Sequence, residues 1–292
     1  MKHIRLCYKN MWPGHKATRG LCDDFFYYAL RQHYIVTLDD QNPDIVISSV
    51  FGTALEGKLF PNNPLIVGYS GESTDYEGEC DIKFGFHAPS DPNYHRLPLW
   101  CLYIDWDTQK VSSNPLHISH LLCRHQRAPA IAERFCNFTY KNPVRDRVEF
   151  FLKLNTVNKI DSTGPLYNNS GYLLGSKVNE LNKWKFTIAW ENTLMPGYVT
   201  EKLLEPLAAG SIPIYHGGHL SKLDFNPQCF ISVNDWTDQS ALIQYINDLS
   251  RDSNKLLEIL SQPVFIEPIN WPEHIFQLIY TKLEAKTPHL AI

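Results

Sequence analysis

Residues 185–218, KFTIAWENTLMPGYVTEKLLEPLAAGSIPIYHGG, decide the fold class of this chain. Aromatic and β-branched residues at 185–190 are typical of a strand, and the polar, turn-forming residues after them indicate a short loop. Thr200 can cap a helix whose apolar residues recur at helical spacing up to Gly210, a residue favoured just past a helix end. A second strand begins after Gly210. The segment therefore predicts a strand–helix–strand unit of an α/β sheet.

Such a unit directs the amino end of its helix toward the carboxyl edge of a parallel sheet. Free N–H groups and the positive end of the helix dipole favour an anion there. Glu201 and Lys202 lie in this first turn. We interpret Lys202 as a ligand of a diphosphate and Glu201 as a partner of sugar hydroxyls, because a carboxylate would repel phosphate. Periodicity alone leaves open a solvated Glu–Lys pair on a helix face.

The stretch WENTLMPGYVTEKLLEPLAAGSIPIYHGG resembles the donor-binding motif of the α1,3-fucosyltransferases. The resemblance continues in LDFNPQCFISVNDW at residues 223–236, with shorter matches at RFCNFTYKNPVRDRVEFF, IDSTGPLYNN, GYSGES and HRLPLW. It extends from about Gly68 to the end of the chain. It implies an α/β fold of the GT-B type, in which two Rossmann-like domains face a central cleft. The alternation of strand-like and helical runs by itself predicts only α/β.

The resemblance divides the chain into three expected segments. Residues 1–127 would form an acceptor-binding α/β domain and residues 128–270 a GDP-fucose-binding Rossmann-like domain. Residues 271–292 would be a C-terminal helix and tail that pack back across the domains. In the first domain we expect strands at 3–8, 34–37, 44–48 and 65–70 and a helix at 23–32. In the remainder we expect a strand at 135–140 and helices at 144–154, 239–249, 254–260 and 273–283.

A carboxylate in the first half is the candidate general base. The strand-like run at residues 65–70 ends in Gly71 and Glu72, so Glu72 follows the carboxyl end of a buried strand, where α/β sites gather. Glu72 also matches the glutamate of the family's Gly-Glu pattern, and the resemblance implies that it removes the proton from the acceptor hydroxyl. Without the resemblance, an exposed loop glutamate among acidic neighbours is the alternative.

Further donor-binding residues follow from the resemblance. Arg145 opens a predicted helix and matches a phosphate-binding arginine of the family, whose guanidinium can hold phosphate through two hydrogen bonds. Arg147 lies two residues on and is expected to point elsewhere. Asn192 and Tyr198 match donor-loop positions that contact the nucleotide or fucose, and Glu191 is similarly placed. A loop Asn and a packed Tyr are also common structural residues.

Two patterns typical of metal sites are interpreted as coincidental. Asp105 and Asp107 form a D-x-D pair, which an Asp-rich chain of this length contains about once by chance. Four residues have ligand-like spacing, although the fourth leaves the helical stripe of the others: His117, His120, Cys123 and His125. We assign no metal ligands. The resemblance implies that Arg145 and Lys202 stabilise the departing GDP in place of a divalent ion, so no cofactor is strictly required.

Composition excludes some classes of partner. The chain has 292 residues, 43% of them hydrophobic and 20% charged, which suffices for two domains or one large domain. A net charge of -4 without long basic runs argues against nucleic acid. No apolar run reaches the ~18 residues of a transmembrane segment, and seven cysteines without a C-x-x-C pair favour reduced thiols. We expect a cytoplasmic protein, with peripheral attachment to the inner membrane face left open.

The implied reaction is an inverting transfer of L-fucose from GDP-β-L-fucose to a hydroxyl of N-acetylglucosamine. O3 of the GlcNAc in a Galβ1-4GlcNAc glycan is the expected acceptor atom, so GDP-fucose and such an oligosaccharide are the expected partners. Residues 10–15, NMWPGH, offer an aromatic ring and polar groups for the acceptor. Two alternatives remain open: a GT-B transferase that uses another nucleotide sugar, and a non-catalytic glycan-binding relative.

Overall fold

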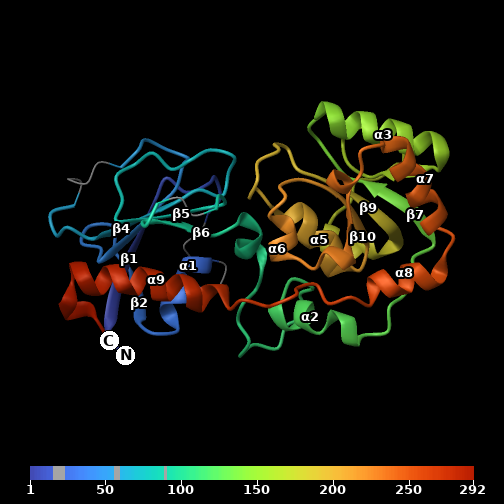
Figure 1. Cartoon of the computed structure of the whole chain (residues 1–292). Helices are drawn as coiled ribbons and strands as arrows, with labels where there is room; N and C mark the ends of the chain where they lie inside the picture. The colour runs from blue at the N-terminus through green and yellow to red at the C-terminus, as the bar shows by residue number, and fades with distance from the viewer. Residues whose placement is uncertain (16–23, 56–59, 89–90) are drawn as a thin grey trace. The chain divides into compact units, whose positions relative to one another are not determined.

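The computed structural model describes residues 1–15, 24–55, 60–88 and 91–292 (Figure 1). The chain forms two compact units, one of residues 1–110 with 269–292 and one of residues 111–268. The division after residue 110 differs from the expected one after residue 127. Residues 111–127 belong to the second unit because Ile118 and Leu121 are buried and Arg124 lies close enough to Cys229 to interact with it electrostatically.

The first unit contains a six-stranded parallel sheet in the order β2-β1-β3-β4-β5-β6. β3 and β4 are buried along their whole length, as strands of a parallel sheet covered on both faces should be. The strands are β1 His3–Lys9, β2 Ile35–Leu38, β3 Ile45–Ser48, β4 Leu65–Tyr69, β5 Ile82–Gly85 and β6 Tyr94–Arg96. The four strands expected in this half are confirmed within one residue at each end.

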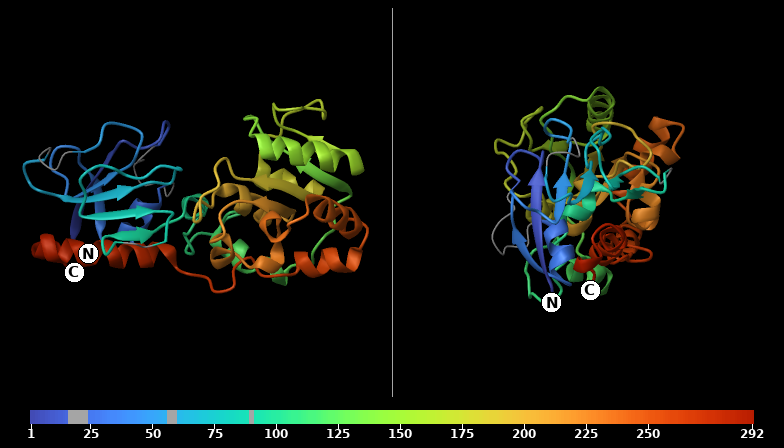
Figure 2. Two further views of the ribbon diagram at one scale, coloured as in Figure 1. Left: turned by 45° about the horizontal axis from the view of Figure 1, so that its top comes forward. Right: turned by 90° about the vertical axis from the view of Figure 1, so that its left-hand side faces the viewer.

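Helix α1, Phe25–Arg31, begins at Asp24, whose side chain accepts a hydrogen bond from the Tyr27 N–H. The start expected at residue 23 lies outside the described residues. Helix α9, Trp271–Lys286, belongs to the same unit and runs alongside its strands (Figures 1 and 2). α9 packs against α1 and β4, and its Phe276 ring stacks on His33 with centroids 3.7 Å apart. The C-terminal helix thus completes the core of the N-terminal sheet.

The second unit contains a five-stranded parallel sheet in the order β11-β10-β9-β7-β8. Its strands are β7 Arg134–Phe138, β8 Ile160–Ser162, β9 Trp184–Trp190, β10 Ile212–His216 and β11 Ile231–Ser232. Its longer helices are α3 Arg145–Val157, α5 Glu201–Ala209, α7 Gln239–Leu249 and α8 Ser253–Leu260. Shorter ones are α2 Ile118–Leu122, α4 Lys177–Glu180 and α6 Ser221–Asp224. Short 3-10 helices of this unit occupy Arg124–Gln126, Leu181–Lys183, Pro227–Cys229 and Val233–Asp235, and those of the first unit occupy Leu99–Tyr103 and Pro288–Leu290.

Alternate side chains of β9 point to opposite faces of this second sheet. Phe186 and Ile188 join a core to which α3, α7 and α8 also contribute. α5 packs on β9 and β10, and its buried leucines lie outside that core cluster. Helices therefore cover both faces, which makes the unit Rossmann-like.

The segment that decides the fold adopts the expected strand–helix–strand arrangement. Thr200 caps α5 by accepting the Lys202 N–H, and Gly210 ends the helix with a left-handed φ of 92°. Trp190 and His216 are register partners at the carboxyl ends of β9 and β10. The loop after β9 and the first turn of α5 are therefore held at this edge of the sheet.

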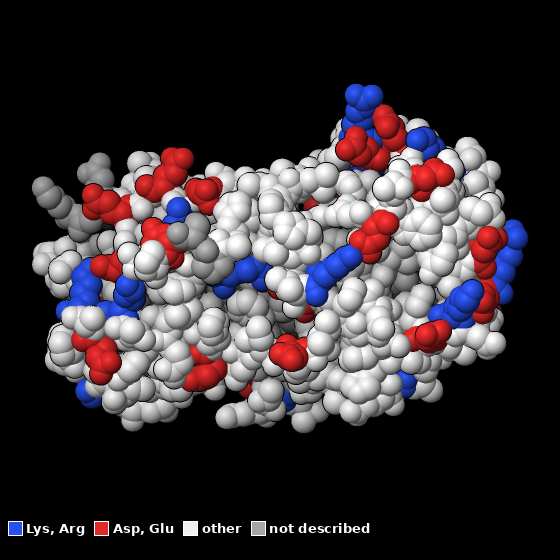
Figure 3. All heavy atoms as spheres, in the orientation of Figure 1, with Lys and Arg blue, Asp and Glu red and all other residues white. Residues whose placement is uncertain are grey.

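The surface carries mixed charge. Among the described residues on the face drawn in Figure 3, Lys and Arg lie beside Asp and Glu in small groups, without an extended basic patch. None of the helices in the described part of the chain combines the length and the apolar character that a membrane crossing needs.

Candidate active site

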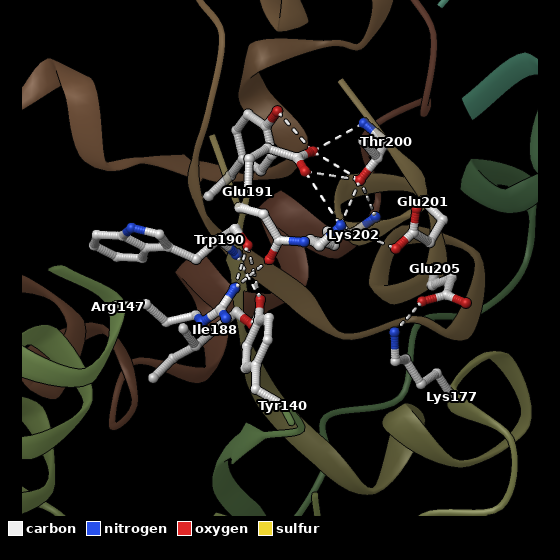
Figure 4. A network of polar contacts seen from close by, with 12 residues as sticks. Tyr140, Arg147, Lys177, Ile188, Trp190, Glu191, Thr200, Glu201, Lys202 and Glu205 are labelled. Carbon is white, nitrogen blue, oxygen red and sulfur yellow. Dashed lines mark hydrogen bonds and ion pairs between the residues drawn. The ribbon is translucent and has the colours of Figure 1, made fainter. Parts of the chain in front are cut away.

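Polar side chains gather at the carboxyl edge of the second sheet. They come from the end of β7, the start of α3, the end of β9 and the first turns of α5 (Figure 4). This is the edge where a helix amino end and strand-end loops form ligand sites in parallel α/β sheets.

Lys202 lies at the centre of this network. Its Nζ is 3.0 Å from Thr200 Oγ1, 3.1 Å from Glu201 Oε1 and 3.4 Å from Glu191 Oε2. Burial by itself would lower the pKa of Lys202, but the charges of Glu191 and Glu201 raise it above its ordinary value. The ammonium therefore stays charged at physiological pH. Its side chain keeps 13% exposure, so it can still meet a ligand.

Glu191 is almost completely buried, at 1% exposure. Its carboxylate accepts hydrogen bonds from the N–H and Oγ1 of Thr200 and from the Tyr215 hydroxyl. Burial raises the pKa of Glu191, while Lys202 and Thr200 oppose that change. Glu191 thus ties β9 to α5 and β10, so the geometry makes it a positioning residue for Thr200 and Lys202.

Glu201 and a second ion pair complete the α5 side of the network. Burial alone would raise the pKa of Glu201, but Lys202 and Lys177 lower it on balance, so the carboxylate is ionised and can accept hydroxyl donors. Lys177 of α4 pairs with Glu205 at 2.9 Å. Figure 4 shows both pairs along one side of α5. The sequence argument missed Lys177 and Glu205, since neither stands in the loop or first turn that it considered.

Arg147 is completely buried, and the expectation that it points elsewhere is wrong. Its guanidinium lies 3.7 Å from the centre of the Tyr140 ring and donates to the Trp190 carbonyl and to Asn192 Oδ1, both at 3.1 Å. A further bond of 2.5 Å reaches the Asn142 carbonyl. Among the described residues its Nε has no partner. Arg147 thus supports the loop that follows β9 and fixes the Asn192 amide.

A helical pattern could have revealed Arg147. The buried residues of α3 are Arg147, Phe150, Phe151 and Leu154, a spacing that forms one face of a helix. Arg145 lies off this face. Its side chain is 88% exposed, and its Nε contacts Glu149 Oε1 at 2.9 Å. The structure does not bring Arg145 to Lys202, so its phosphate-binding role stays a prediction.

The other loop residues differ in exposure. Asn192 is exposed and its amide oxygen accepts from Arg147, whereas Tyr198 is buried and its N–H closes a turn with the Met195 carbonyl at 3.1 Å. His216, which sequence reasoning missed, packs on Trp190 with centroids 4.3 Å apart. Burial lowers the pKa of His216, and its buried Nδ1 has no partner among the described residues. A neutral imidazole therefore borders the loop.

Glu72 lies in the first unit, immediately after β4, at a cavity of about 390 Å³. The preceding Gly71 allows a close approach of side chains, because a Cβ on Gly71 would lie 2.6 Å from Tyr69 Oη and 2.7 Å from a Leu99 methyl carbon. Glu72 itself is exposed. The cavity is lined by Trp12, Ser49, Phe51, Tyr69, Gly71, Glu72, Leu99, Leu102 and Tyr103. A carboxylate among aromatic rings suits a polar ligand with apolar faces.

The two metal-like patterns have structural roles. Asp107 pairs with Arg31 at 2.8 Å, and Asp105 accepts the Asp107 N–H at 3.2 Å. His117 caps α2 through its Nδ1. Within the described ranges no group of three or more His, Cys, Asp or Glu side chains is placed to hold a metal ion.

Comparison with known proteins decides the family. Residues 127–261 match the model described as glycosyltransferase family 10 (fucosyltransferase) C-term, and residues 7–103 match the alpha-(1,3)-fucosyltransferase FucT N-terminal domain. The chain belongs to glycosyltransferase family 10. The resemblance on which the site residues were chosen is thereby confirmed at the level of the family.

Curated fucosyltransferases resemble this chain to different extents. The alpha-(1,3)-fucosyltransferase FucT of Helicobacter pylori is 28% identical over 285 residues, which are 88% of this chain and 59% of that protein. Alpha-(1,3)-fucosyltransferase B of Drosophila melanogaster is 45% identical over 78 residues, 26% of this chain and 17% of that protein. The chain thus spans about three fifths of the length of the H. pylori relative.

Solved structures of α1,3-fucosyltransferases share the fold. A crystal structure of an α1,3-fucosyltransferase with GDP-fucose matches with a TM-score of 0.75 at 23% identity, covering 97% of this chain and 91% of that one. A structure with GDP matches with a TM-score of 0.74 over the same shares. The expected α/β fold of the GT-B type is confirmed by this likeness.

Proposed function

We propose that this family 10 protein transfers L-fucose, with inversion, from GDP-β-L-fucose to a GlcNAc hydroxyl of a glycan. The proposed acceptor atom is O3 of the GlcNAc in a Galβ1-4GlcNAc unit. The observation that carries the proposal is the Lys202 network, in which a charged, partly exposed ammonium stands at the amino end of α5. Family membership and the GDP-fucose complex of a structural relative support the choice of donor.

The second unit would bind the donor. Lys202 and the positive end of the α5 dipole attract the diphosphate, Glu201 accepts hydroxyl hydrogen bonds of ribose or fucose, and the loop with Asn192 and Tyr198 borders the sugar. Arg145 would break its ion pair with Glu149 and bind the diphosphate beside Lys202. Both side chains of that pair are largely exposed, and an ion pair of this kind is easily exchanged for a phosphate contact.

The first unit would supply the base. Glu72 accepts the proton of the acceptor hydroxyl as that oxygen attacks C1 of fucose on the face opposite the phosphate. The bond between C1 and the phosphate oxygen breaks, and its electron pair leaves with GDP. The β-linked donor therefore gives an α-linked product. Lys202 and Arg145 stabilise the charge that develops on GDP.

Incubation with GDP-fucose and Galβ1-4GlcNAc, with and without EDTA, tests the proposal. We expect GDP release and a product whose NMR spectrum has fucose α-linked to O3 of GlcNAc, at similar rates in both samples. Parallel samples with GDP-mannose and UDP-sugars test the other-donor alternative. Transfer from one of these other donors would overturn the proposed function. Absence of GDP release with every glycan of a panel would also overturn it. The second result would favour a non-catalytic glycan-binding relative.

A further inference from the structure

The Glu72 cavity is built at the carboxyl ends of three adjacent strands. β1, β3 and β4 are neighbours in the sheet, and the residues that follow them, Trp12, Phe51 and Glu72, all line the cavity. Its volume of about 390 Å³ falls in the range of small-ligand sites. The cavity thus has the position of a binding site in an α/β unit.

Large aromatic side chains line the same cavity as Glu72. Phe51 keeps 43% and Tyr103 40% of its surface exposed, and Trp12 is partly exposed. Flat rings offer an apolar surface to the C–H faces of a pyranose, while a carboxylate accepts its hydroxyls. This combination favours a sugar over a wholly apolar ligand.

Trp12 is held in place through its neighbour His15. The two rings meet edge to face with centroids 4.7 Å apart, and the His15 N–H bonds the Trp12 carbonyl at 3.0 Å. His15 Nε2 lies 2.5 Å from Asp24 Oδ2. The nearly buried Asp24 also accepts the Tyr8 hydroxyl and caps α1 through the Tyr27 N–H. Asp24 therefore ties the Trp12 turn to β1 and α1.

The loops after β1 and β3 are fixed to each other as well. Asn10 Nδ2 donates to the Thr53 carbonyl at 2.6 Å, and the Phe51 N–H donates to the Asn10 carbonyl at 3.0 Å. A Cβ on Gly52 would come within 2.1 Å of Asn10 Oδ1, so only glycine allows this approach. These contacts hold the loop that carries Trp12 against the loop that carries Phe51.

From this arrangement we infer that Trp12 is the sugar platform that selects a galactose next to the reacting GlcNAc, with His15 and Asp24 as its positioning residues. The axial O4 of β-galactose leaves the C–H groups of C3, C4 and C5 together on one face, which can lie flat on an indole. Glu72 lines the same cavity and takes the GlcNAc hydroxyl. The inference rests on the proposed fucosyl transfer and adds the determinant of acceptor choice.

Steady-state kinetics of Trp12→Ala with Galβ1-4GlcNAc and with GlcNAcβ1-4GlcNAc tests the inference. We expect the acceptor KM for the galactose-containing glycan to rise about tenfold, because the substitution removes the binding free energy of roughly one aromatic packing contact. The KM for the second glycan should change much less, so the preference for galactose disappears. Trp12→Phe should retain part of the preference. Tyr245→Ala, which removes an exposed ring of the second unit, is the matched control.

A double-mutant cycle separates positioning from general structure. His15→Gln should raise the same KM several-fold with kcat little changed, and should have no further effect in the Trp12→Ala background. Additive effects of the two substitutions would mean that His15 does not act through Trp12. An unchanged galactose preference in an active Trp12→Ala enzyme would overturn the platform itself.

Saturation-transfer NMR distinguishes this inference from the proposed function. If wild-type protein transfers no fucose, the proposed function fails, but binding of Galβ1-4GlcNAc can still be measured. Saturation of galactose H3, H4 and H5 that disappears in Trp12→Ala would support the platform. No saturation of these protons in the wild-type protein would overturn it.

Discussion

At the scale of single residues, burial and charge decide which member of the Lys202 network can bind a ligand. Glu191 and Lys202 lie in the same network, yet Glu191 is enclosed by Thr200 and Tyr215 while Lys202 keeps an exposed surface. The buried Glu191 carboxylate orients Lys202, and the positive charge of Lys202 offsets the negative charge of Glu191. We therefore assign ligand binding to Lys202 and positioning to Glu191.

Glu72→Gln tests the assignment of the base. The amide cannot accept the hydroxyl proton, so we expect kcat to fall by ~10² to 10⁴-fold, the usual contribution of a general base. GDP affinity, measured by calorimetry, should stay unchanged because Glu72 belongs to the other unit. Glu79→Gln replaces another acidic residue of the same unit and is the control. Near-normal turnover by Glu72→Gln would remove Glu72 from the mechanism.

Sequence reasoning correctly placed Glu72 after a strand and Lys202 in the first turn of a helix, because each belongs to a short motif whose neighbours mark a strand or helix end. Their roles stay predictions. The same reasoning missed Arg147 because it considered only nearness to the helix start and not the buried stripe of α3. Tyr140, Lys177 and His216 come from separate segments of the chain. Their assembly depends on strand order, which local patterns do not specify.

At the scale of elements, α3 separates two arginines with different tasks. Arg145 projects into solvent, whereas Arg147 is buried with bonds to the Trp190 and Asn142 carbonyls and to Asn192. One helix turn thus carries a candidate ligand and a structural support. The boundaries of α5 were predictable because Thr200 and Gly210 mark its ends, whereas β11 has two residues and depends on pairing with β10.

Substituting Arg147 and Arg145 separately tests whether one stabilises the fold and the other binds the donor. Arg147→Met removes the three hydrogen bonds that this buried guanidinium donates, so we expect the free energy of unfolding to fall by about 2–4 kcal/mol. Arg145→Ala should leave unfolding unchanged and weaken GDP-fucose binding about tenfold. Urea unfolding and calorimetry measure the two effects. The reverse pattern, with Arg145 stabilising the fold and Arg147 dispensable, would contradict this division of roles.

At the scale of the whole molecule, each unit has its own sheet and core, and the chain enters the second unit once and then returns for α9. The sequence predicted α/β units and a terminal helix. It did not predict the division after residue 110, because the alternation of elements does not show on which core residues 111–127 pack. The unit to which residues 111–127 belong depends on the tertiary contacts of α2 and Arg124.

Phe276→Ala tests the dependence of the first unit on α9. The ring is buried against His33, and its loss from a core typically costs about 3–5 kcal/mol. We expect the thermal transition of the first unit to move to lower temperature while the second unit still binds GDP with normal affinity. Leu223→Ala, at a position 77% exposed, should change neither property. Equal loss of GDP binding would show that the units do not behave separately.

The central claim is that Lys202 holds a nucleoside diphosphate at the start of α5. Calorimetric titration of GDP into wild type, Lys202→Ala and the control Lys222→Ala tests it most directly, since Lys222 is a surface lysine paired with Asp235. Loss of a charged hydrogen bond should raise the Kd of Lys202→Ala about 10- to 100-fold, with Lys222→Ala like wild type. Equal GDP affinity in all three folded proteins would contradict the account.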